Sequence, residues 1–336
     1  MKVWAVLTGV LALASAVAGA GLLAVRAQAN ADSLTNALAL AERPTPASRT
    51  APGSAATPVA TPPSASVSAS LPATPALAAP SAAAPAPVSL DALPRSITFH
   101  QTNTYNGAIV YVPDGCHDSY DLVLHFHGAH PYVRDLIEKA NLNAVVAVFN
   151  AGNGAEKYSQ AYGAGGTLSS LLRQIDMATA PLCPGAKLAR VALMAWSAGY
   201  AATEKLLSRE EDRERVDALL LADGLHAGFT DRWKRTFAPN ALQAFRDFGA
   251  LAKAGKKLFA ITHSSIMTDG YGSTTECSRL LLKALDVHCD DDLVSGKSGT
   301  FSIQGFTGDD KAAHIVQFRH MDTTLLSKLR ARWAKP

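Results

Sequence analysis

Short apolar runs alternate with helical patterns from residue 108 to residue 333 of this chain. The runs, rich in β-branched and aromatic residues, cover 108–112, 122–126, 144–149, 191–195, 218–222, 258–262 and 301–306. Helix candidates lie between and after them, near 132–141, 166–178, 198–208, 240–254, 275–287 and 312–333. Strands separated by helices predict an α/β fold, with a mostly parallel central sheet and helices on both faces.

The first 94 residues have a different composition. Twelve of the 18 prolines lie between Pro44 and Pro94, in a stretch of Ala, Ser, Thr and Pro with few charges. Such a stretch has too little apolar bulk to offset the entropy of ordering the chain, so residues 31–94 are predicted to be a disordered linker. The other 242 residues, 95–336, are enough for one large domain with its own core.

The predicted domain is nearly neutral. Residues 95–336 hold 27 Lys and Arg against 25 Asp and Glu, without a basic block. Nucleic acids and anionic membrane surfaces bind proteins through clustered Lys and Arg. The charge pattern therefore argues against either as the main partner.

Residues 3–25 are uncharged and largely apolar. At about 1.5 Å per residue they are long enough to span a bilayer. Lys2 and the small-x-small patterns at 16–18 and 27–29 are also typical of an export signal. Residues 1–30 are therefore interpreted as a signal peptide or an uncleaved membrane anchor. In both cases the domain is exported, secreted or periplasmic, and contacts a membrane only through residues 3–25.

Four cysteines fit an oxidising compartment. Cys116 and Cys183 each precede a predicted strand by six or seven residues. If these strands are neighbours, the two cysteines lie near the same end of the sheet, so a Cys116–Cys183 disulfide is predicted. A predicted helix holds Cys277 and Cys289 beyond the roughly 7 Å that a disulfide spans, and their pairing stays open.

The most informative segment is an apolar strand that runs into a helix through residues 195–199, Ala-Trp-Ser-Ala-Gly. A small-x-Ser-x-Gly turn of this kind is typical of a nucleophile elbow, which raises a serine hydroxyl clear of the sheet. Ser197 is the predicted nucleophile. An ordinary strand-to-helix connection could also place a serine here as the helix N-cap, but it would not explain the small residues on both sides.

At this turn the sequence resembles the α/β-hydrolase superfamily, and within it the extracellular esterases of the feruloyl-esterase or polyester-depolymerase type. The resemblance covers essentially all of residues 95–336 by the order of strands and helices, with Ala195 where the family usually has glycine. It implies an α/β-hydrolase fold and a catalytic domain over this range.

A second matching motif follows the run 122–126, as His127-Gly128-Ala129. Family members use a backbone N–H here, together with that of the residue after the nucleophile, to bind the substrate oxyanion. The resemblance therefore implies Ala129 and Ala198 as oxyanion donors. His125, His127 and His130 crowd this turn, but no further ligand suggests a metal site, so a structural role is predicted for them.

In this superfamily the histidine that accepts the serine proton follows the last strand. Apolar positions from Phe318 onward follow helical spacing and predict a helix that begins near Ala312. His314 then lies in its first turn and is the predicted base. His320 stays an alternative, because residues 322–324, Asp-Thr-Thr, could cap a helix that begins later.

Family acids usually follow the strand that here ends near Thr262, but this segment continues into His263-Ser264-Ser265 without a carboxylate. Asp223 ends the preceding strand, a position that some lipases of the superfamily use, and it is the predicted acid. A turn residue before Gly224 would look the same. Asp269, further along the next loop, is the alternative.

Trp196, His127, Gly128 and Tyr158 are predicted to line the pocket, with His226 and His263 as further candidates. The sequence thus predicts an exported serine hydrolase that cleaves a small-molecule or polymeric ester through an acyl-enzyme, without a cofactor. A peptidase or acyltransferase would use the same groups. A catalytically silent hydrolase-fold module that binds a partner at the cell envelope is the alternative from another class.

Overall fold

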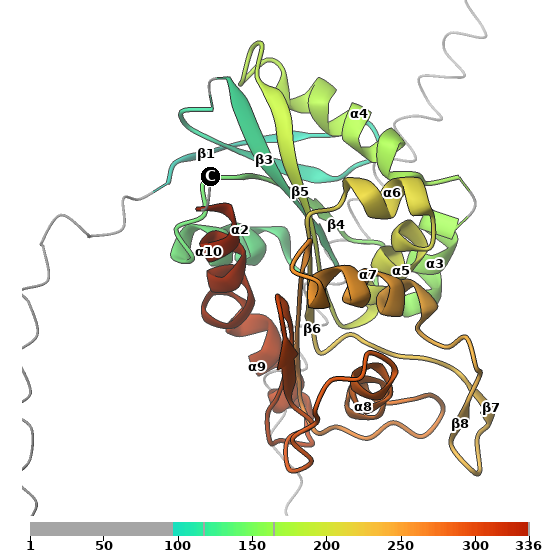
Figure 1. Ribbon diagram of the computed structural model, residues 1–336. Helices are drawn as coiled ribbons and strands as arrows, with labels where there is room; N and C mark the ends of the chain where they lie inside the picture. The colour runs from blue at the N-terminus through green and yellow to red at the C-terminus, as the bar shows by residue number, and fades with distance from the viewer. Residues whose placement is uncertain (1–96, 117, 164, 335–336) are drawn as a thin grey trace, which may run out of the picture. The chain divides into compact units, whose positions relative to one another are not determined.

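The computed structural model describes residues 97–116, 118–163 and 165–334 (Figure 1). The predicted signal or anchor segment 1–30, the predicted linker 31–94 and the domain boundary after residue 94 lie outside the described residues. Within them, no helix combines the length and the apolar character needed to cross a membrane.

Nine strands of the described residues form the central sheet. In order across the sheet they are β1 (Phe99–Asn103), β2 (Ile109–Pro113), β4 (Val145–Phe149), β3 (Ser119–Phe126), β5 (Lys187–Trp196), β6 (Ala218–Ala222), β9 (Leu258–His263), β11 (Phe301–Gly305) and β10 (Gly296–Ser298). Neighbours from β4 to β11 are parallel, and antiparallel strands flank them. The sheet is mostly parallel, as the sequence predicted.

All seven predicted runs are strands of this sheet. The sequence did not predict β1, β10 or the small hairpin of β7 (Phe229–Asp231) and β8 (Thr236–Phe237). These strands have five residues or fewer and are partly exposed, so they carry no apolar run that would identify them.

Helices cover both faces of the sheet (Figure 1). One face carries α2 (His130–Lys139), α9 (Lys311–Arg319), the π-helical turn η3 (Asp322–Leu326) and α10 (Ser327–Trp333). The other carries α3 (Ala155–Gly163), α4 (Leu168–Thr179), α5 (Tyr200–Leu207), α6 (Glu210–Arg215), α7 (Gln243–Lys253) and α8 (Thr274–Ala284).

The sheet separates two hydrophobic cores. On β3, Leu122 and Leu124 belong to one core, whereas Val123 between them belongs to the other. Successive side chains of a strand point to opposite faces, so a strand buried on both faces must be apolar at every position. This explains why the central strands read as unbroken apolar runs in the sequence.

The predicted helix over 312–333 is broken in the structure. Its first part begins at Lys311, close to the predicted start, and Asp310 caps it by accepting the N–H of Ala313 at 2.8 Å. The first part ends near His320, whose carbonyl accepts the backbone N–H of Thr324 and the hydroxyls of Thr323 and Thr324. The π-helical turn η3 and α10 follow.

Two short helices differ from what the sequence suggested. Residues 155–163 are not among the predicted helices but form α3. The charged run 209–215 is not among them either and forms α6, whose Asp212 is buried and accepts the N–H of Leu168 at 3.2 Å. Asp212 therefore links α6 to the start of α4.

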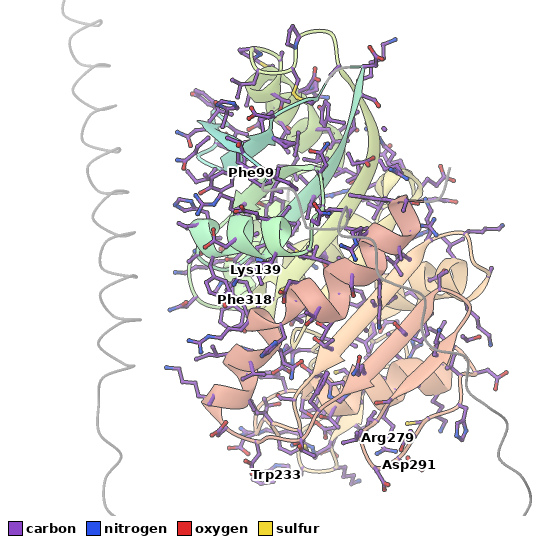
Figure 2. The ribbon with its side chains drawn as sticks, turned by 90° about the vertical axis from the view of Figure 1, so that its left-hand side faces the viewer. Phe99, Lys139, Trp233, Arg279, Asp291 and Phe318 are labelled. Atoms are coloured by element: carbon purple, nitrogen blue, oxygen red, sulfur yellow. A yellow bond between two sulfur atoms is a disulfide. The ribbon has the colours of Figure 1, made fainter. Side chains whose placement is uncertain are left out.

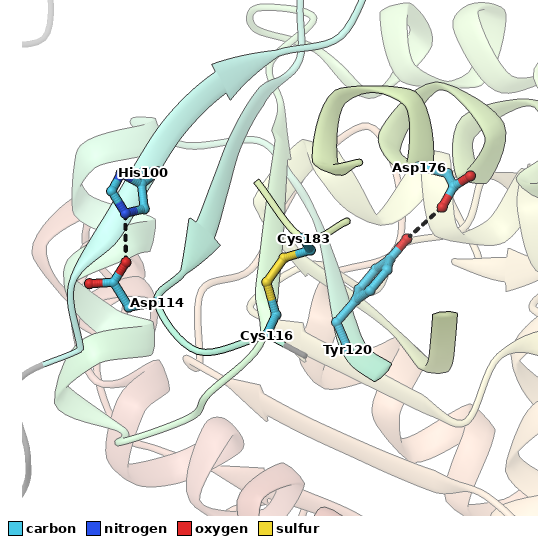
Figure 3. The surroundings of a disulfide bond; sticks show 6 residues. All are labelled: His100, Asp114, Cys116, Tyr120, Asp176 and Cys183. Atoms are coloured by element: carbon cyan, nitrogen blue, oxygen red, sulfur yellow. Dashed lines mark hydrogen bonds and ion pairs between the residues drawn. A yellow bond between two sulfur atoms is a disulfide. The ribbon is translucent and has the colours of Figure 1, made fainter. Parts of the chain in front are cut away.

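Cys116 and Cys183 form a disulfide, as predicted, with Cα atoms 5.6 Å apart (Figure 3). The bond joins the segment before β3 to the segment before β5, so it lies toward the amino ends of these parallel strands. Cys277 is a buried free thiol and Cys289 a partly exposed one.

Candidate active site

Three neighbouring parallel strands end side by side and lead into the turns that sequence analysis singled out. Phe126 of β3 pairs with Ala195 of β5, and Trp196 of β5 pairs with Ala222 of β6. The residue that follows each strand, His127, Ser197 and Asp223, has a positive φ of 73°, 48° and 44°. Non-glycine residues rarely adopt this conformation, and such strain clusters at functional sites.

Two glycines let these turns approach one another. A Cβ at Gly199 would overlap the carbonyl of Phe126, and a Cβ at Gly224 would lie 2.5 Å from the carbonyl oxygen of Ser197. The backbone after β6 therefore packs directly against the backbone of Ser197. These two contacts explain why glycine is needed two residues after Ser197, at Gly199, and directly after Asp223, at Gly224.

Asp223 and His314 are in direct contact. The Nδ1 atom of His314 donates to Oδ2 of Asp223 at 2.8 Å, and Asp223 is only 4% exposed. A carboxylate can only accept, so the imidazole proton is on Nδ1 and Nε2 carries the free lone pair. His314 thus presents a proton acceptor while Asp223 fixes its tautomer.

Ser264, which the sequence did not indicate, also holds Asp223. Its backbone N–H donates to Oδ1 at 3.1 Å and its hydroxyl donates to Oδ2 at 2.6 Å. Burial alone would raise the pKa of Asp223, but the hydrogen bonds from His314 and Ser264 outweigh it and lower this pKa. The carboxylate therefore stays ionised. Ser264 follows β9, the strand end where family acids were expected.

The alternative residues lie apart from this contact. His320 is exposed at the end of α9, and Asp269 is exposed in the loop after β9. Within the described part of the chain, neither side chain is hydrogen-bonded to the Asp223–His314 pair. The structure thus brings together the preferred base and the preferred acid of the sequence analysis.

Ser197 opens the short 3-10 turn η2 (Ser197–Gly199), directly before α5. Its side chain is partly exposed, and its hydroxyl has no hydrogen-bond partner among the described residues. The preceding residue, Trp196, contacts His314 twice. The centroids of the two rings lie 4.9 Å apart, and Nε1 of Trp196 donates to the His314 carbonyl at 3.3 Å. Trp196 therefore links the serine turn to the first turn of α9.

The two implied oxyanion donors lie at helix starts. Ala129 precedes α2, and its N–H has no acceptor among the described residues. Ala198 lies in the first turn of η2, where N–H groups have no partner within the helix. Gly128 between strand and helix has a φ of 131°, and a Cβ there would lie 2.9 Å from the Phe318 ring.

A wall of stacked rings borders the site. Trp196 stacks against His127 with centroids 5.1 Å apart and against Phe318 at 4.8 Å. Figure 2 labels Phe318 beside α2. The apolar spacing predicted Phe318 only as a helix position, although its distance of four residues from His314 places both on one helix face.

Tyr158 supports this wall from behind. It was predicted to line the pocket, but its side chain is fully buried, and its hydroxyl lies 3.0 Å from Nδ1 of His127. Burial and the nearby His314 lower the pKa of His127 to about 4, so His127 is neutral at pH 7. The other histidines of this turn also bond within the protein, His125 to the His127 carbonyl and His130 to the Tyr111 hydroxyl.

Two cavities of the described residues lie away from this site. One of about 290 Å³ borders Cys116, Tyr120 and Arg190 toward the amino ends of the strands, and one of about 600 Å³ lies between α7 and α8. The chemistry described above places the candidate site at the carboxyl ends instead, where parallel sheets bind ligands.

No protein-family model matches this chain, and no curated protein matches it. Among solved structures it is similar to an IroE-like serine hydrolase from Shewanella oneidensis, at 12% identity and a TM-score of 0.42, over 67% of this chain and 79% of that one. It is also similar to TT1662 from Thermus thermophilus (12%, TM-score 0.40, 71% and 99%). A Pyrobaculum calidifontis esterase is a third (12%, TM-score 0.37, 70% and 83%). The activities in these names are those of the named proteins.

Proposed function

We propose that this protein is an exported serine hydrolase that cleaves carboxylic esters through Ser197, His314 and Asp223. The observation that carries the proposal is the 2.8 Å bond from His314 to the buried Asp223, next to a strained turn that begins with a serine. A base whose tautomer is fixed by a buried carboxylate is what a serine hydroxyl needs in order to lose its proton. The disulfide supports export, because such bonds persist in oxidising compartments.

In the proposed reaction, Ser197 Oγ attacks the ester carbonyl while His314 Nε2 takes the serine proton. The N–H groups of Ala129 and Ala198 stabilise the oxyanion, an effect worth about 3 kcal/mol per donor in comparable sites. The C–O bond to the alcohol then breaks, and His314 returns the proton to the leaving oxygen. Water, activated by the same histidine, hydrolyses the acyl-enzyme and frees Ser197.

The proposed substrate is a small-molecule or polymeric ester without strong charge. Trp196, His127 and Phe318 offer an apolar aromatic surface, and His127 carries no charge at pH 7. Such walls suit an uncharged acyl or aryl group. No cofactor takes part in the proposed chemistry.

The test uses the full chain and p-nitrophenyl esters of short acids. We expect hydrolysis, and covalent labelling of Ser197 by a fluorophosphonate probe that mass spectrometry locates. Ser197→Ala should lose about 10⁶-fold in kcat and all labelling. Ser208→Ala, at the far end of α5, is the matched control and should keep both. A folded chain that shows neither turnover nor label would instead support the catalytically silent binding module.

A further inference from the structure

His226 lies beside the candidate site, four residues after the strand that ends in Ala222. The intervening Gly224 packs against the backbone of Ser197. Tyr200, one helical turn after Ser197, contacts the His226 ring at a centroid distance of 5.2 Å. The segment that leads to His226 thus begins at the proposed acid Asp223, and the helical turn that leads to Tyr200 begins at the proposed nucleophile Ser197.

The hydrogen bond of His226 fixes its protonation. Its Nδ1 lies 3.0 Å from the carbonyl oxygen of Gly272, which can only accept, so Nδ1 carries the proton. Burial lowers the pKa of this imidazole, so the ring is neutral at pH 7. Nε2 is therefore an acceptor with a free lone pair.

The Gly272 carbonyl that imposes this tautomer is held in place. The N–H of Gly272 donates to the Ala227 carbonyl at 2.8 Å. A Cβ at Gly272 would clash with the Phe237 ring and lie 3.0 Å from Sγ of Cys277, so this segment packs closely. The orientation of His226 is thus set by packed backbone rather than by a mobile side chain.

Nε2 of His226 has no hydrogen-bond partner among the described residues, and it is not one of their fully enclosed polar atoms. The Tyr271 ring also contacts the His226 ring in a T-shaped arrangement, with centroids 5.1 Å apart, and Tyr271 is 47% exposed. The cluster of Tyr200, His226 and Tyr271 therefore opens to solvent and offers a hydrogen-bond acceptor, His226 Nε2, beside two aromatic rings.

His127, which stacks on Trp196, differs in this respect. Its Nδ1 faces the Tyr158 hydroxyl, which can either donate or accept, so this contact does not fix which nitrogen carries the proton. Unlike His127, His226 therefore has a defined acceptor, as does the proposed base His314.

We propose that His226 is a specificity-determining residue, whose Nε2 accepts a hydrogen bond from a hydroxyl group of the substrate that lies beside Tyr200 and Tyr271. This inference rests on the proposed ester hydrolysis and names a feature of its substrate. A site built to accept a hydroxyl disfavours the analogue without it, because the acceptor is then shielded from water without a partner.

The test measures kcat/KM for matched methyl esters of two series over several chain lengths. One series carries an aliphatic terminal hydroxyl and the other a para-hydroxyphenyl group, and each ester has a methoxy and an unsubstituted partner of the same length. At the chain length that fits the site, the wild-type kcat/KM should be about tenfold higher for the hydroxyl ester than for its methoxy and unsubstituted partners. The series that shows this preference identifies whether an alkyl or an aryl group carries the hydroxyl.

The preference is a ratio within one protein, so a general loss of activity cancels. His226→Phe keeps an aromatic ring in contact with the two tyrosines and should abolish the preference. His226→Asn can still donate to Gly272 and accept from the substrate, so it should retain part of it. Tyr271→Phe should retain it as well, because the acceptor is unchanged.

Two results would overturn the inference while leaving ester hydrolysis intact. The first is turnover of all esters by the wild type without any hydroxyl preference. The second is a preference that survives in His226→Phe. If no ester is turned over and Ser197 is not labelled, the proposed function itself fails.

Discussion

The two ends of the central sheet are built for different purposes. At the amino ends, charged and polar groups are paired: Arg190 donates to both oxygens of Asp121, and Tyr120 donates to Asp176 near the disulfide (Figure 3). At the carboxyl ends, three consecutive turns have positive φ, and the Ser197 hydroxyl has no partner among the described residues. The amino ends pair their polar side chains, whereas the carboxyl ends leave the Ser197 hydroxyl without a partner among the described residues.

The contrast indicates that the amino ends stabilise the folded state, whereas the carboxyl ends carry backbone strain that destabilises it. Backbone strain costs about 1–3 kcal/mol per residue and persists only when the surrounding structure imposes it. The Cys116–Cys183 disulfide and partly buried ion pairs constrain the other end of the same strands. We therefore expect changes at the carboxyl ends to alter activity with little effect on stability, and changes at the amino ends to do the reverse.

The largest effect is expected for His314→Ala, which removes the proposed base. The value of kcat should fall about 10⁶-fold, as for other residues that act as a unit with a serine nucleophile. The melting temperature should change little, because Ser264 still donates to Asp223 twice. Ester turnover and thermal unfolding measure the two quantities.

His320→Ala is the matched control, since His320 lies at the other end of α9. This variant should keep wild-type kcat. Loss of activity in His320→Ala with retention in His314→Ala would reverse the assignment of the base.

The second effect concerns the amino ends. Replacing both Cys116 and Cys183 by Ser opens a loop with a sequence separation of 67 residues. In the chain-entropy model this costs about 4 kcal/mol of unfolding free energy. Urea denaturation should show this loss, whereas kcat at 25 °C should stay unchanged.

Cys289→Ser serves as the control, because Cys289 is a free thiol. It should have the stability of the wild type. A large fall in kcat for the folded double variant would show that the two ends of the sheet are not independent.

The smallest effect concerns Asp217, which precedes β6. Burial would raise its pKa, but hydrogen bonds from Arg332 and Trp333 outweigh it and lower this pKa. The folded state then binds fewer protons than the unfolded state near pH 4, so stability should fall as pH drops through this range. Asp217→Asn should lower the free energy of unfolding by about 2 kcal/mol at pH 7. The decrease of this free energy toward acidic pH should then be less steep than in the wild type.

Arg332→Ala tests the same pair from the other side, since Arg332 donates to both oxygens of Asp217. The free energy of unfolding, measured with urea from pH 7 to pH 3, should show the same shallower dependence. An unchanged slope in both variants would contradict a role for this pair.

Much of the fold could be predicted because the central strands are buried on both faces and read as apolar runs. Ser197 could be predicted because a tight strand-to-helix turn restricts its neighbours to small residues. His314 followed from the apolar spacing after Phe318, which fixed the start of α9. These signals are local, and each spans only a few residues.

Other parts of the site depend on contacts between distant segments. Ser264 has no local pattern that marks it, because its function depends on Asp223 lying 41 residues earlier on the neighbouring strand. The burial of Tyr158 depends on α3, whose sequence lacks a clear apolar period.

The C-terminal segment is held to β6 at both ends of that strand, through Arg332 on Asp217 and through His314 on Asp223. This arrangement has a consequence in time. The ribosome adds Ser197 and Asp223 long before His314, so β6 is synthesised before α9, the helix that carries His314. A nascent chain therefore has its proposed nucleophile without a base, and the proposed chemistry can begin only after His314 has been added and its helix α9 has folded beside Asp223.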